Sequence, residues 1–509
     1  MIISLSVLVI TIIVSGTYAL YKAQLSKNIG VNTTTHGLAY YINYVKGTDI
    51  TAATLNPSTS YEGGASSDIE FWKKDDSYDI YGKIELTVNT IGTNLSNSPA
   101  LKYAVVNNGN VLKEGSLKGT TSGSKVTILK NLYLEQTKQI YTVYVWLDNS
   151  EELGNISNES LSISVDCTAS LQKEPAADTI ISLYTSAAKV TATNNSITYN
   201  TAPSVSLMND RLGGTTTSLD GGNIRYYGAS PNNYIYFNCS DYSNQTSSTC
   251  ETWRIIGVFD GKLKLIRGSQ IGTYSWDNKN ISTGAEDDRG KNDWTTARLM
   301  KLLNPDDYYI NDNNDKDSEG NYLGYSLYYN SASGICFTDE GVNYSACDFT
   351  STGIKNDETR NMIAETTYNL GGWNDTGVYP NEIYEYERGT TVYTGRPTTW
   401  TGKIALAYPS DYGYAADLNQ CKQTLANYDN STCTSNNWMK AIITDNGSNH
   451  GWLLTPDSSY SFGAWYSHGN VGEYFTGAAR GAVPVLSLSS KLGIESGDGS
   501  SSNPYKLSA

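Results

Sequence analysis

The chain is poor in the side chains and motifs on which hydrolytic and metal-dependent catalysis most often relies. Its 509 residues include only three histidines, His36, His450 and His468. HExxH, GxSxG, P-loop and dinucleotide-binding motifs are all missing, and no CxxC pair offers a zinc site. Because residues 1–449 hold a single histidine, a zinc peptidase site is excluded there.

Charged residues are scarce as well, at 17% of the chain, and the acidic ones outnumber the basic ones by 51 to 36. The resulting net charge of −15 repels phosphate backbones, and no basic cluster offsets it. We therefore expect no nucleic-acid partner. The chain is instead rich in tyrosine, with 40, and in glycine, with 46, which is typical of a β-rich, loop-rich extracellular protein.

The N-terminal residues predict an attachment to the membrane. Residues 2–21 carry no charge and consist mainly of Ile, Val and Leu, which is enough to cross about 30 Å of hydrocarbon as a helix. We predict a transmembrane helix or signal anchor over residues 1–22, then a spacer over residues 23–40. The small residues at 16–19 offer an alternative in which the segment is cleaved and the protein is secreted.

The orientation across the membrane has two opposing indications. Lys22 and Lys27 follow the apolar run and no basic residue precedes it, so the positive-inside rule alone places the body of the protein in the cytoplasm. The cysteines indicate instead that the body of the protein lies on the extracellular side. We expect a single-pass protein of the cell membrane with extracellular domains.

Six of the seven cysteines form pairs that are close in sequence. Two pairs are eleven residues apart and one is twelve apart, and each encloses a polar, turn-rich stretch: Cys239 and Cys250, Cys336 and Cys347, Cys421 and Cys433. This spacing predicts three local disulfides, each stabilising by roughly 2–3 kcal/mol on the loop-entropy model. The alternative is six free thiols. Cys167 is left over, as a buried thiol or, alternatively, an intermolecular bridge.

Strand patterns divide the chain into domains. Apolar and polar residues alternate in four runs, at residues 84–88, 125–129, 141–147 and 161–165. They predict an all-β sandwich over residues 41–168. Residues 169–222 are rich in Ala, Thr, Ser and Asn and predict a linker with a short helix near residues 178–184. Residues 223–509 show neither a repeat nor a second linker, so we expect one α+β domain.

Strands and two helices are expected within that last domain. The strands lie at residues 234–237, 253–259, 262–266 and 403–414, with a hairpin turn at Asp260 and Gly261. The helices cover residues 293–304, after a capping Asp293, and residues 357–370.

The C-terminal sequence resembles a known domain family. Trp452, Leu453, Leu454, Thr455 and Pro456 form one short apolar run, and residues 481–486 form another with the sequence Gly-Ala-Val-Pro-Val-Leu. These runs resemble a domain of unknown function in surface proteins of Gram-positive gut bacteria, whose signature pairs a Trp-Leu-(Arg/Leu)-(Ser/Thr)-Pro strand with a Gly-Val-Arg-Pro-Val-Leu strand. Val483 stands where the family has Arg, so no role of that arginine is carried over. The resemblance implies a C-type-lectin-like fold, which formylglycine-generating enzymes share.

A second resemblance concerns the predicted sandwich. Residues 41–165, with the Gly-Thr-Tyr-Ala sequence before them, are similar to the camelysin and matrix-fibre group of Gram-positive bacteria. That group has been linked with peptidase activity, but this chain lacks the HExxH motif that such activity needs. We therefore expect the sandwich to serve as a stalk.

The candidate ligand-binding residues lie between the two C-terminal apolar runs: Trp465, Tyr466, His468, Asn470 and Tyr474. Flat rings with nearby amides suit stacking on sugars or anchoring a protein partner. Trp465 has core packing as an equal alternative, and Trp452 is expected in the core.

Two acidic clusters are further candidates. Asp315, Asp317 and Glu319 place oxygen ligands at alternate positions before a glycine, as a calcium loop does, which makes calcium the candidate cofactor; an acidic surface loop is the alternative. Glu385 and Glu387 share one face if they lie in a strand, about 7 Å apart, which suits general acid/base catalysis. A solvated, charged strand edge is the alternative.

Together these observations predict a non-catalytic adhesin or ligand-binding protein of the cell surface, which binds a glycan or a protein through its C-terminal domain. One alternative is an extracellular glycan-acting hydrolase that uses Glu385 or Glu387. The other is a structural surface or fibre subunit.

Overall fold

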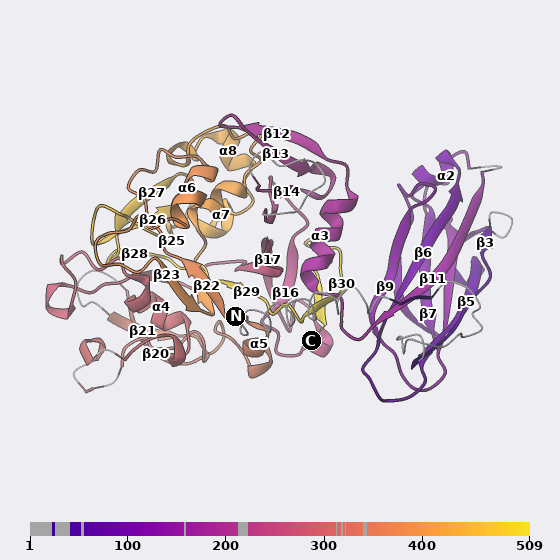
Figure 1. Cartoon of the computed structure of the whole chain (residues 1–509), viewed down its shortest axis with the longest axis horizontal. Coiled ribbons are helices and arrows are strands. Elements are labelled where there is room, and N and C mark those ends of the chain that lie inside the picture. Colours follow the sequence, from indigo (N-terminus) through magenta and orange to yellow (C-terminus); the bar gives the residue numbers. More distant parts are fainter. Residues whose placement is uncertain are drawn as a thin grey trace, which may run out of the picture. The chain divides into compact units, whose positions relative to one another are not determined.

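The computed structural model describes residues 23–25, 41–51, 55–156, 159–211, 222–311, 313–316, 319–320, 322–338 and 344–508. The chain forms two compact units, one ending at Glu174 and the other beginning at Pro175 (Figure 1). The predicted membrane segment, residues 1–22, lies outside the described residues. Among those that are described, no helix is long and apolar enough to cross a membrane.

The first unit consists of two packed sheets. One has the strand order β1-β11-β6-β9, with β3 paired to β11, and the other has the order β2-β5-β10-β7-β8, with β4 paired to β10. The strands are β1 (Ala23–Leu25), β2 (Ile42–Val45), β3 (Ile50–Thr51), β4 (Pro57–Ser58), β5 (Ala65–Lys73), β6 (Tyr81–Ile91), β7 (Leu101–Asn107), β8 (Asn110–Ser116), β9 (Lys125–Tyr133), β10 (Ile140–Asp148) and β11 (Leu161–Ser170), with a short helix α2 (Thr93–Asn97).

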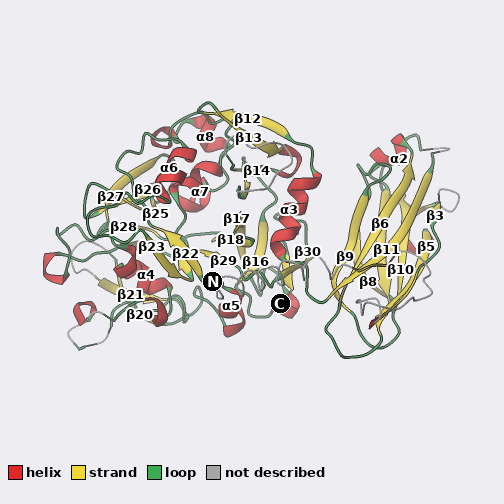
Figure 2. Cartoon of the chain, viewed as in Figure 1, coloured by secondary structure: helices red, strands yellow, loops and turns green. Residues whose placement is uncertain are grey.

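Alternation of side chains explains this sandwich. Along β6, Ile84, Leu86 and Val88 are fully buried while the residues between them are more exposed, as expected of a strand with one face in the core. The predicted sandwich is thus confirmed, and Figure 2 shows strands dominating this unit. The predicted spacer is wrong at residues 23–25, because these form β1 and pair with β11, Leu25 opposite Cys167. Cys167 is a buried free thiol, as expected.

The second unit contains a long antiparallel sheet and a shorter mixed one, in which β25 and β28 run parallel. The long sheet has the order β12-β13-β14-β15-β17-β18-β29-β24, with β16 on β17, and the shorter has the order β19-β28-β25-β26-β27. The long sheet comprises β12 (Val190–Asn194), β13 (Ile197–Ala202), β14 (Leu207–Asn209), β15 (Ile224–Tyr226), β16 (Tyr234–Phe237), β17 (Glu251–Phe259), β18 (Lys262–Arg267), β24 (Ile404–Ala405) and β29 (Val485–Ser487). The shorter comprises β19 (Thr273–Ser275), β25 (Gly451–Pro456), β26 (Gly463–Ser467), β27 (Val471–Phe475) and β28 (Ala479–Gly481).

Hairpins and short helices complete this unit. The paired strands are β20 (Ser333–Phe337) with β21 (Tyr344–Asp348), β22 (Thr366–Asn369) with β23 (Thr399–Gly402), and β30 (Gly493–Ser496) with β31 (Lys506–Ser508). The helices are α3 (Ala176–Ser186), α4 (Arg298–Leu303), α5 (Asp357–Met362), α6 (Pro380–Glu387), α7 (Pro409–Tyr414), α8 (Ser431–Ser435) and α9 (Lys440–Ile443).

The predicted linker is wrong, because most of its described residues belong to the second unit. The helix expected near residues 178–184 is α3, whose Ile180 and Tyr184 lie in the main core. The strands β12, β13 and β14 that follow extend the long sheet, and Leu207 of β14 pairs with Tyr226 of β15. The domain therefore begins about 48 residues earlier than the composition of residues 169–222 indicates, at Pro175 rather than at residue 223.

Other elements match the expectations in part. The hairpin at Asp260 and Gly261 is confirmed, with φ angles of 49° and 70° that suit a tight turn. Asp293 caps a 3-10 turn over Trp294–Thr296 and α4 follows it. The helix expected over residues 357–370 ends at Met362, and β22 replaces its second half. The strand expected over residues 403–414 becomes a helix, α7, from Pro409 onward, because proline at the first position fits a helix start.

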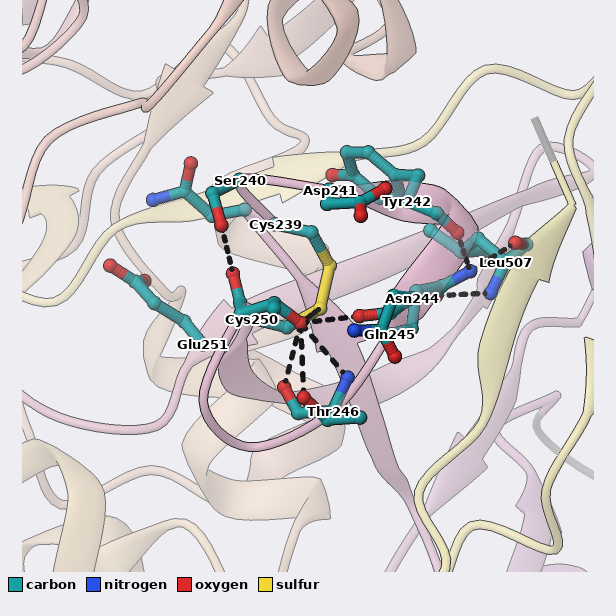
Figure 3. Close-up of a disulfide and its surroundings, with 12 residues drawn as sticks. Cys239, Ser240, Asp241, Tyr242, Asn244, Gln245, Thr246, Cys250, Glu251 and Leu507 are labelled. Carbon is teal, nitrogen blue, oxygen red and sulfur yellow. Dashed lines mark hydrogen bonds between the residues drawn. A yellow bond between two sulfur atoms is a disulfide. The ribbon is translucent and has the colours of Figure 1, made fainter.

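All three predicted disulfides are confirmed. Figure 3 shows the loop closed by Cys239 and Cys250, and the side chain of Gln245 within it. The Gln245 amide donates to the carbonyl of Leu507 at 2.6 Å, and its carbonyl accepts from the Leu507 N–H at 2.9 Å. The loop therefore holds the C-terminal strand β31 in place.

A buried ionic network joins elements of the long sheet to α7. The guanidinium of Arg225 pairs with Asp210 at 2.5 Å and with Asp411 at 2.9 Å, and Asp411 also pairs with Lys264. Arg225 and Asp411 are each 1% exposed, so neither charge has water to stabilise it.

Candidate functional site

Strands β25, β26 and β27, which are coloured orange to yellow in Figure 1, place aromatic side chains on alternate faces of the shorter sheet. Tyr466 lies opposite Trp452 on β25 and opposite Gly472 on β27. Because side chains alternate along a strand, Tyr466 and Tyr474 point to one face while Trp465 points to the other.

Five side chains gather on the face of Tyr466, and we name them the aromatic–arginine patch: His450, Tyr466, His468, Tyr474 and Arg480. Stacked rings connect His450 to His468 at a centroid distance of 4.0 Å and to Tyr466 at 5.1 Å. Tyr466 meets Tyr474 edge-on at 6.3 Å. Two of the three histidines in the chain thus lie together in one cluster.

Arg480 lies at the centre of this patch. Its guanidinium carbon is 3.9 Å from the ring centroid of Tyr466, 4.4 Å from that of Tyr474 and 5.4 Å from that of Trp452. Cation–π contacts of this kind suit arginine. The residue is 9% exposed, and within the described part of the chain its Nε has no hydrogen-bond partner and its guanidinium no carboxylate partner. Burial lowers the pKa of Arg480, and only the two tyrosines oppose that effect. The patch therefore carries an uncompensated positive charge.

The histidine pair adds polar atoms to the patch. Burial and then the charges of Arg480 and His468 lower the pKa of His450, so its imidazole is neutral at neutral pH. Its Nδ1 is buried and has no hydrogen-bond partner among the described residues. His468 is exposed.

The turn between β26 and β27 is tightly held. The His468 N–H donates to the carbonyl of Asn470 at 3.0 Å, and Gly469 between them has a φ of 104°, which favours glycine. The Tyr412 hydroxyl donates to the Gly469 carbonyl at 2.5 Å. A Cβ at Gly472 would lie 3.0 Å from the Tyr466 ring, so glycine there lets the ring lie across β27.

Of the five predicted ligand-binding residues, the structure brings Tyr466, His468 and Tyr474 together in the patch. Of the two alternatives for Trp465, core packing holds and exposed binding does not: Trp465 is fully buried, and its indole N–H donates to the carbonyl of Trp373 at 3.1 Å. Asn470 is half-buried and its amide donates to the carbonyl of Ala426 at 3.4 Å, so it supports the turn. Trp452 is in the core, as expected.

The sequence reasoning missed His450 and Arg480. Both lie at the ends of predicted apolar runs, His450 just before β25 and Arg480 within β28. The backbone connects them, because the Gly481 N–H donates to the His450 carbonyl at 2.7 Å. The scarcity of histidine in the chain was the one signal that singled out position 450.

The predicted calcium loop does not have the arrangement of a metal site at Asp315. Asp315 is fully buried, and its carboxylate pairs with Arg298 at 2.8 Å and Lys301 at 2.7 Å and accepts from the Tyr325 hydroxyl. These cations already neutralise it, so the expectation of Asp315 as a calcium ligand is wrong. Asp317 lies outside the described residues, and Glu319 is exposed. Among the residues described, no group of three or more His, Cys, Asp or Glu is placed to hold a metal ion.

The predicted carboxylate pair is also wrong, because its residues lie in helix α6 and not in a strand. Positions two apart on a helix point in different directions. Glu385 is exposed, whereas Glu387 is fully buried and accepts from the Ser410 N–H at 2.9 Å. Burial raises the pKa of Glu387 to about 7.

A different pair of carboxyl groups interacts on the other face of this sheet, where Glu473 lies opposite Trp465. Partial burial, a hydrogen bond with Asp457 and the charges of Asp457 and Asp375 raise the pKa of Glu473 to about 8. Asp457 is fully buried, and its Oδ1 accepts from the Ser459 and Tyr460 N–H groups at 2.5 and 2.8 Å. At neutral pH the Glu473 carboxyl is therefore protonated.

The aromatic–arginine patch is the cluster in which exposed rings, unpaired polar atoms and an uncompensated charge coincide. Function has to be inferred from its chemistry. No protein-family model matches this sequence, and no curated protein matches it.

Proposed function

We propose that the second unit is a non-catalytic binding domain that engages a glycan or a protein ligand through the aromatic–arginine patch. The observation that carries this proposal is Arg480, which lies between Tyr466 and Tyr474 without a carboxylate partner in the described chain. A buried charge without a partner is costly, and a ligand that supplies an acceptor recovers part of that cost.

The surroundings of Arg480 also suit a binding role. Tyr474 is 42% exposed and offers a flat face for a sugar ring or an apolar side chain. His450 and His468 supply nitrogen atoms that hydrogen-bond to hydroxyl groups. The turn that carries His468 is fixed by the Tyr412 contact, so little order has to be gained on binding. The resemblance of the C-terminal sequence to C-type-lectin-like domains is in keeping with this proposal.

We place the protein at the outside of the cell, attached through residues 1–22. The support for an exported protein is the set of three disulfides, each within a short loop, since such bonds persist in oxidising compartments. The first unit serves in this proposal as a stalk.

Array screening of the full chain, produced through an oxidising secretory route, tests the binding function. We would screen glycan and host-protein arrays with and without calcium, then repeat each hit with Arg480→Gln and Tyr474→Ala. Tyr344→Ala is the matched control, because Tyr344 is 46% exposed on β21, outside the patch. Specific binding that both patch variants lose and the control keeps is the expected result. Binding that both patch variants keep contradicts the proposal.

A glycan-acting hydrolase is a second candidate, and the carboxyl pair of Asp457 and Glu473 is the observation that favours it. A raised pKa of about 8 suits a general acid at neutral pH. The close interaction of the two groups weighs against this candidate, because glycosidases separate their carboxyls by about 5–9.5 Å to admit the sugar. Release of reducing sugar from any bound glycan, lost in Glu473→Gln, would favour the hydrolase.

A structural fibre subunit is a third candidate. Strand β8 forms one edge of its sheet, and it exposes Val111 by 43% and Leu112 by 42%. Such an edge can pair with another chain. Concentration-dependent assembly of the full chain, abolished by Val111→Lys, would favour this role.

A further inference from the structure

A second arginine, Arg254 of β17, is buried without a carboxylate partner and lines a cavity of its own. The cavity has a volume of about 460 Å³ and is bordered by Tyr234, Glu251, Arg254, Arg267, Ser269 and Ile442, among others. It shares no lining residue with the aromatic–arginine patch. Its volume is within the range of sites for small molecules.

The guanidinium of Arg254 is held in place but not neutralised. Its Nε donates to the side-chain oxygen of Asn233 at 2.5 Å, and its Nη2 donates to the carbonyl of Pro231 at 3.3 Å. The ring of Tyr234 lies 3.7 Å from the guanidinium carbon and that of Trp438 lies 4.9 Å away. In the described chain, Nη1 has no acceptor. These contacts fix the plane of the guanidinium and leave its Nη1 free to donate to a ligand.

No nearby acid compensates the charge of Arg254. The residue is 8% exposed, and burial lowers its pKa to about 10, with only the hydroxyl of Tyr234 acting in the opposite direction. Arg254 therefore stays protonated at neutral pH and carries a full charge although its side chain is largely buried.

The one carboxylate that borders the cavity, Glu251, is already paired. Arg267 donates its Nε to Glu251 at 3.0 Å and its Nη2 at 3.3 Å, and the Trp253 indole donates to the same carboxylate at 3.0 Å. Arg267 directs its Nη1 to the Ser269 hydroxyl at 2.9 Å. The pair of Glu251 and Arg267 is neutral overall, so the cavity keeps a net charge of +1 from Arg254.

We propose that this cavity is a second ligand site, which binds the oxyanion of a small anionic sugar. Arginine is the side chain best suited to carboxylate and phosphate groups, and the fixed plane of Arg254 reduces the entropy lost on binding. The hydroxyl of Ser269 and the apolar side chain of Ile442 border the same space, as the hydroxyls and ring of a sugar require. The carboxylate of a uronic acid and the phosphate of a sugar phosphate share this chemistry.

Calorimetric titration of the full chain with three matched sugars tests the site. Glucuronic acid carries a carboxylate, glucose 6-phosphate carries a phosphate, and glucose carries neither. We expect one of the two anions to bind at least tenfold more tightly than glucose, and to weaken as salt is raised. The stronger of the two identifies the source of the oxyanion. Failure of both anions to exceed glucose overturns the proposal.

Three variants locate the binding. Arg254→Gln removes the charge and is expected to weaken the anion at least tenfold, while Arg289→Gln removes an exposed arginine charge elsewhere and is expected to leave binding unchanged. Ser269→Trp fills the cavity from its exposed rim without altering Arg254. If Arg254→Gln fails to fold, anion binding by Ser269→Trp decides whether the cavity is the site. Full binding by a folded Arg254→Gln or by Ser269→Trp overturns the proposal. Because the patch and the cavity share no residue, Arg480→Gln tests the patch separately.

Discussion

The imidazole rings of His450 and His468 stack with their centroids 4.0 Å apart and an angle of 19° between their planes, although the two residues lie on different strand ends. Stacking brings two groups that can both become cations close to each other and to Arg480. Protonation of His450 is therefore opposed by its burial and its neighbours, and the patch becomes sensitive to mild acid.

This geometry predicts a loss of stability in mild acid that depends on His450. The folded chain lowers the pKa of His450, whereas the unfolded chain titrates near pH 6.5. The unfolded state thus binds more protons as the pH falls below about 6.5, so the free energy of unfolding falls there. Between pH 7.5 and pH 5.5 the melting temperature of His450→Gln should fall less than that of the wild type. Equal losses in the two proteins contradict the assignment.

Glu473 gives a pH dependence of opposite sign. Its pKa is raised to about 8 in the folded chain, so the folded state holds a proton that the unfolded state releases above its ordinary value near 4.5. The stabilising contribution is complete below about pH 4.5 and is lost as the pH rises to about 8. Glu473→Gln imitates the protonated group and should flatten the decline of the melting temperature between pH 5 and pH 8. Glu385→Gln, at an exposed position on α6, is the control and should follow the wild type.

The sequence was informative where the deciding interactions are local. Alternation within single strands predicts the sandwich of the first unit, because each strand buries one face in the core whichever strands it pairs with. The disulfides follow from short loops for the same reason: Cys421 and Cys433 are close in space because few residues separate them.

The sequence failed where pairing between distant strands decides. Whether Trp465 or Tyr466 faces the core depends on the register of β26 against β25 and β27, which no local pattern contains. The role of Arg480 depends on the absence of a nearby acid in space. Helix α6 is different, because the sequence carries a local signal for its start: Pro380 stands at the first position, and Glu382 accepts from the Tyr379 N–H at 2.8 Å.

The buried network around Asp411 should be essential for the stability of the second unit. Asp411→Asn removes the carboxylate charge that pairs with both Arg225 and Lys264. The buried Lys264 then loses the one ion pair that the described residues give it. Breaking a buried pair by removing one partner costs about 3–5 kcal/mol. Denaturant unfolding with intact disulfides measures this loss. Asp357→Asn breaks an ion pair whose carboxylate is 91% exposed, and it should cost at most about 1 kcal/mol. Similar losses in the free energy of unfolding for the two variants would contradict the argument that burial makes the Asp411 ion pairs important for stability.

Gln245 should determine how firmly the C-terminal strand is held. Gln245→Ala removes both hydrogen bonds to the backbone of Leu507 and leaves a buried N–H and a buried carbonyl there without these partners. An unsatisfied buried group costs about 1–3 kcal/mol. We expect faster amide exchange at Leu507 and a lower melting temperature, while the disulfide of Cys239 and Cys250 still forms. Gln420→Ala, at an exposed position, should change neither. Unchanged exchange at Leu507 in Gln245→Ala would mean that the pairing of β31 with β30 holds the strand unaided, since Ile494 lies opposite Leu507 in that pair.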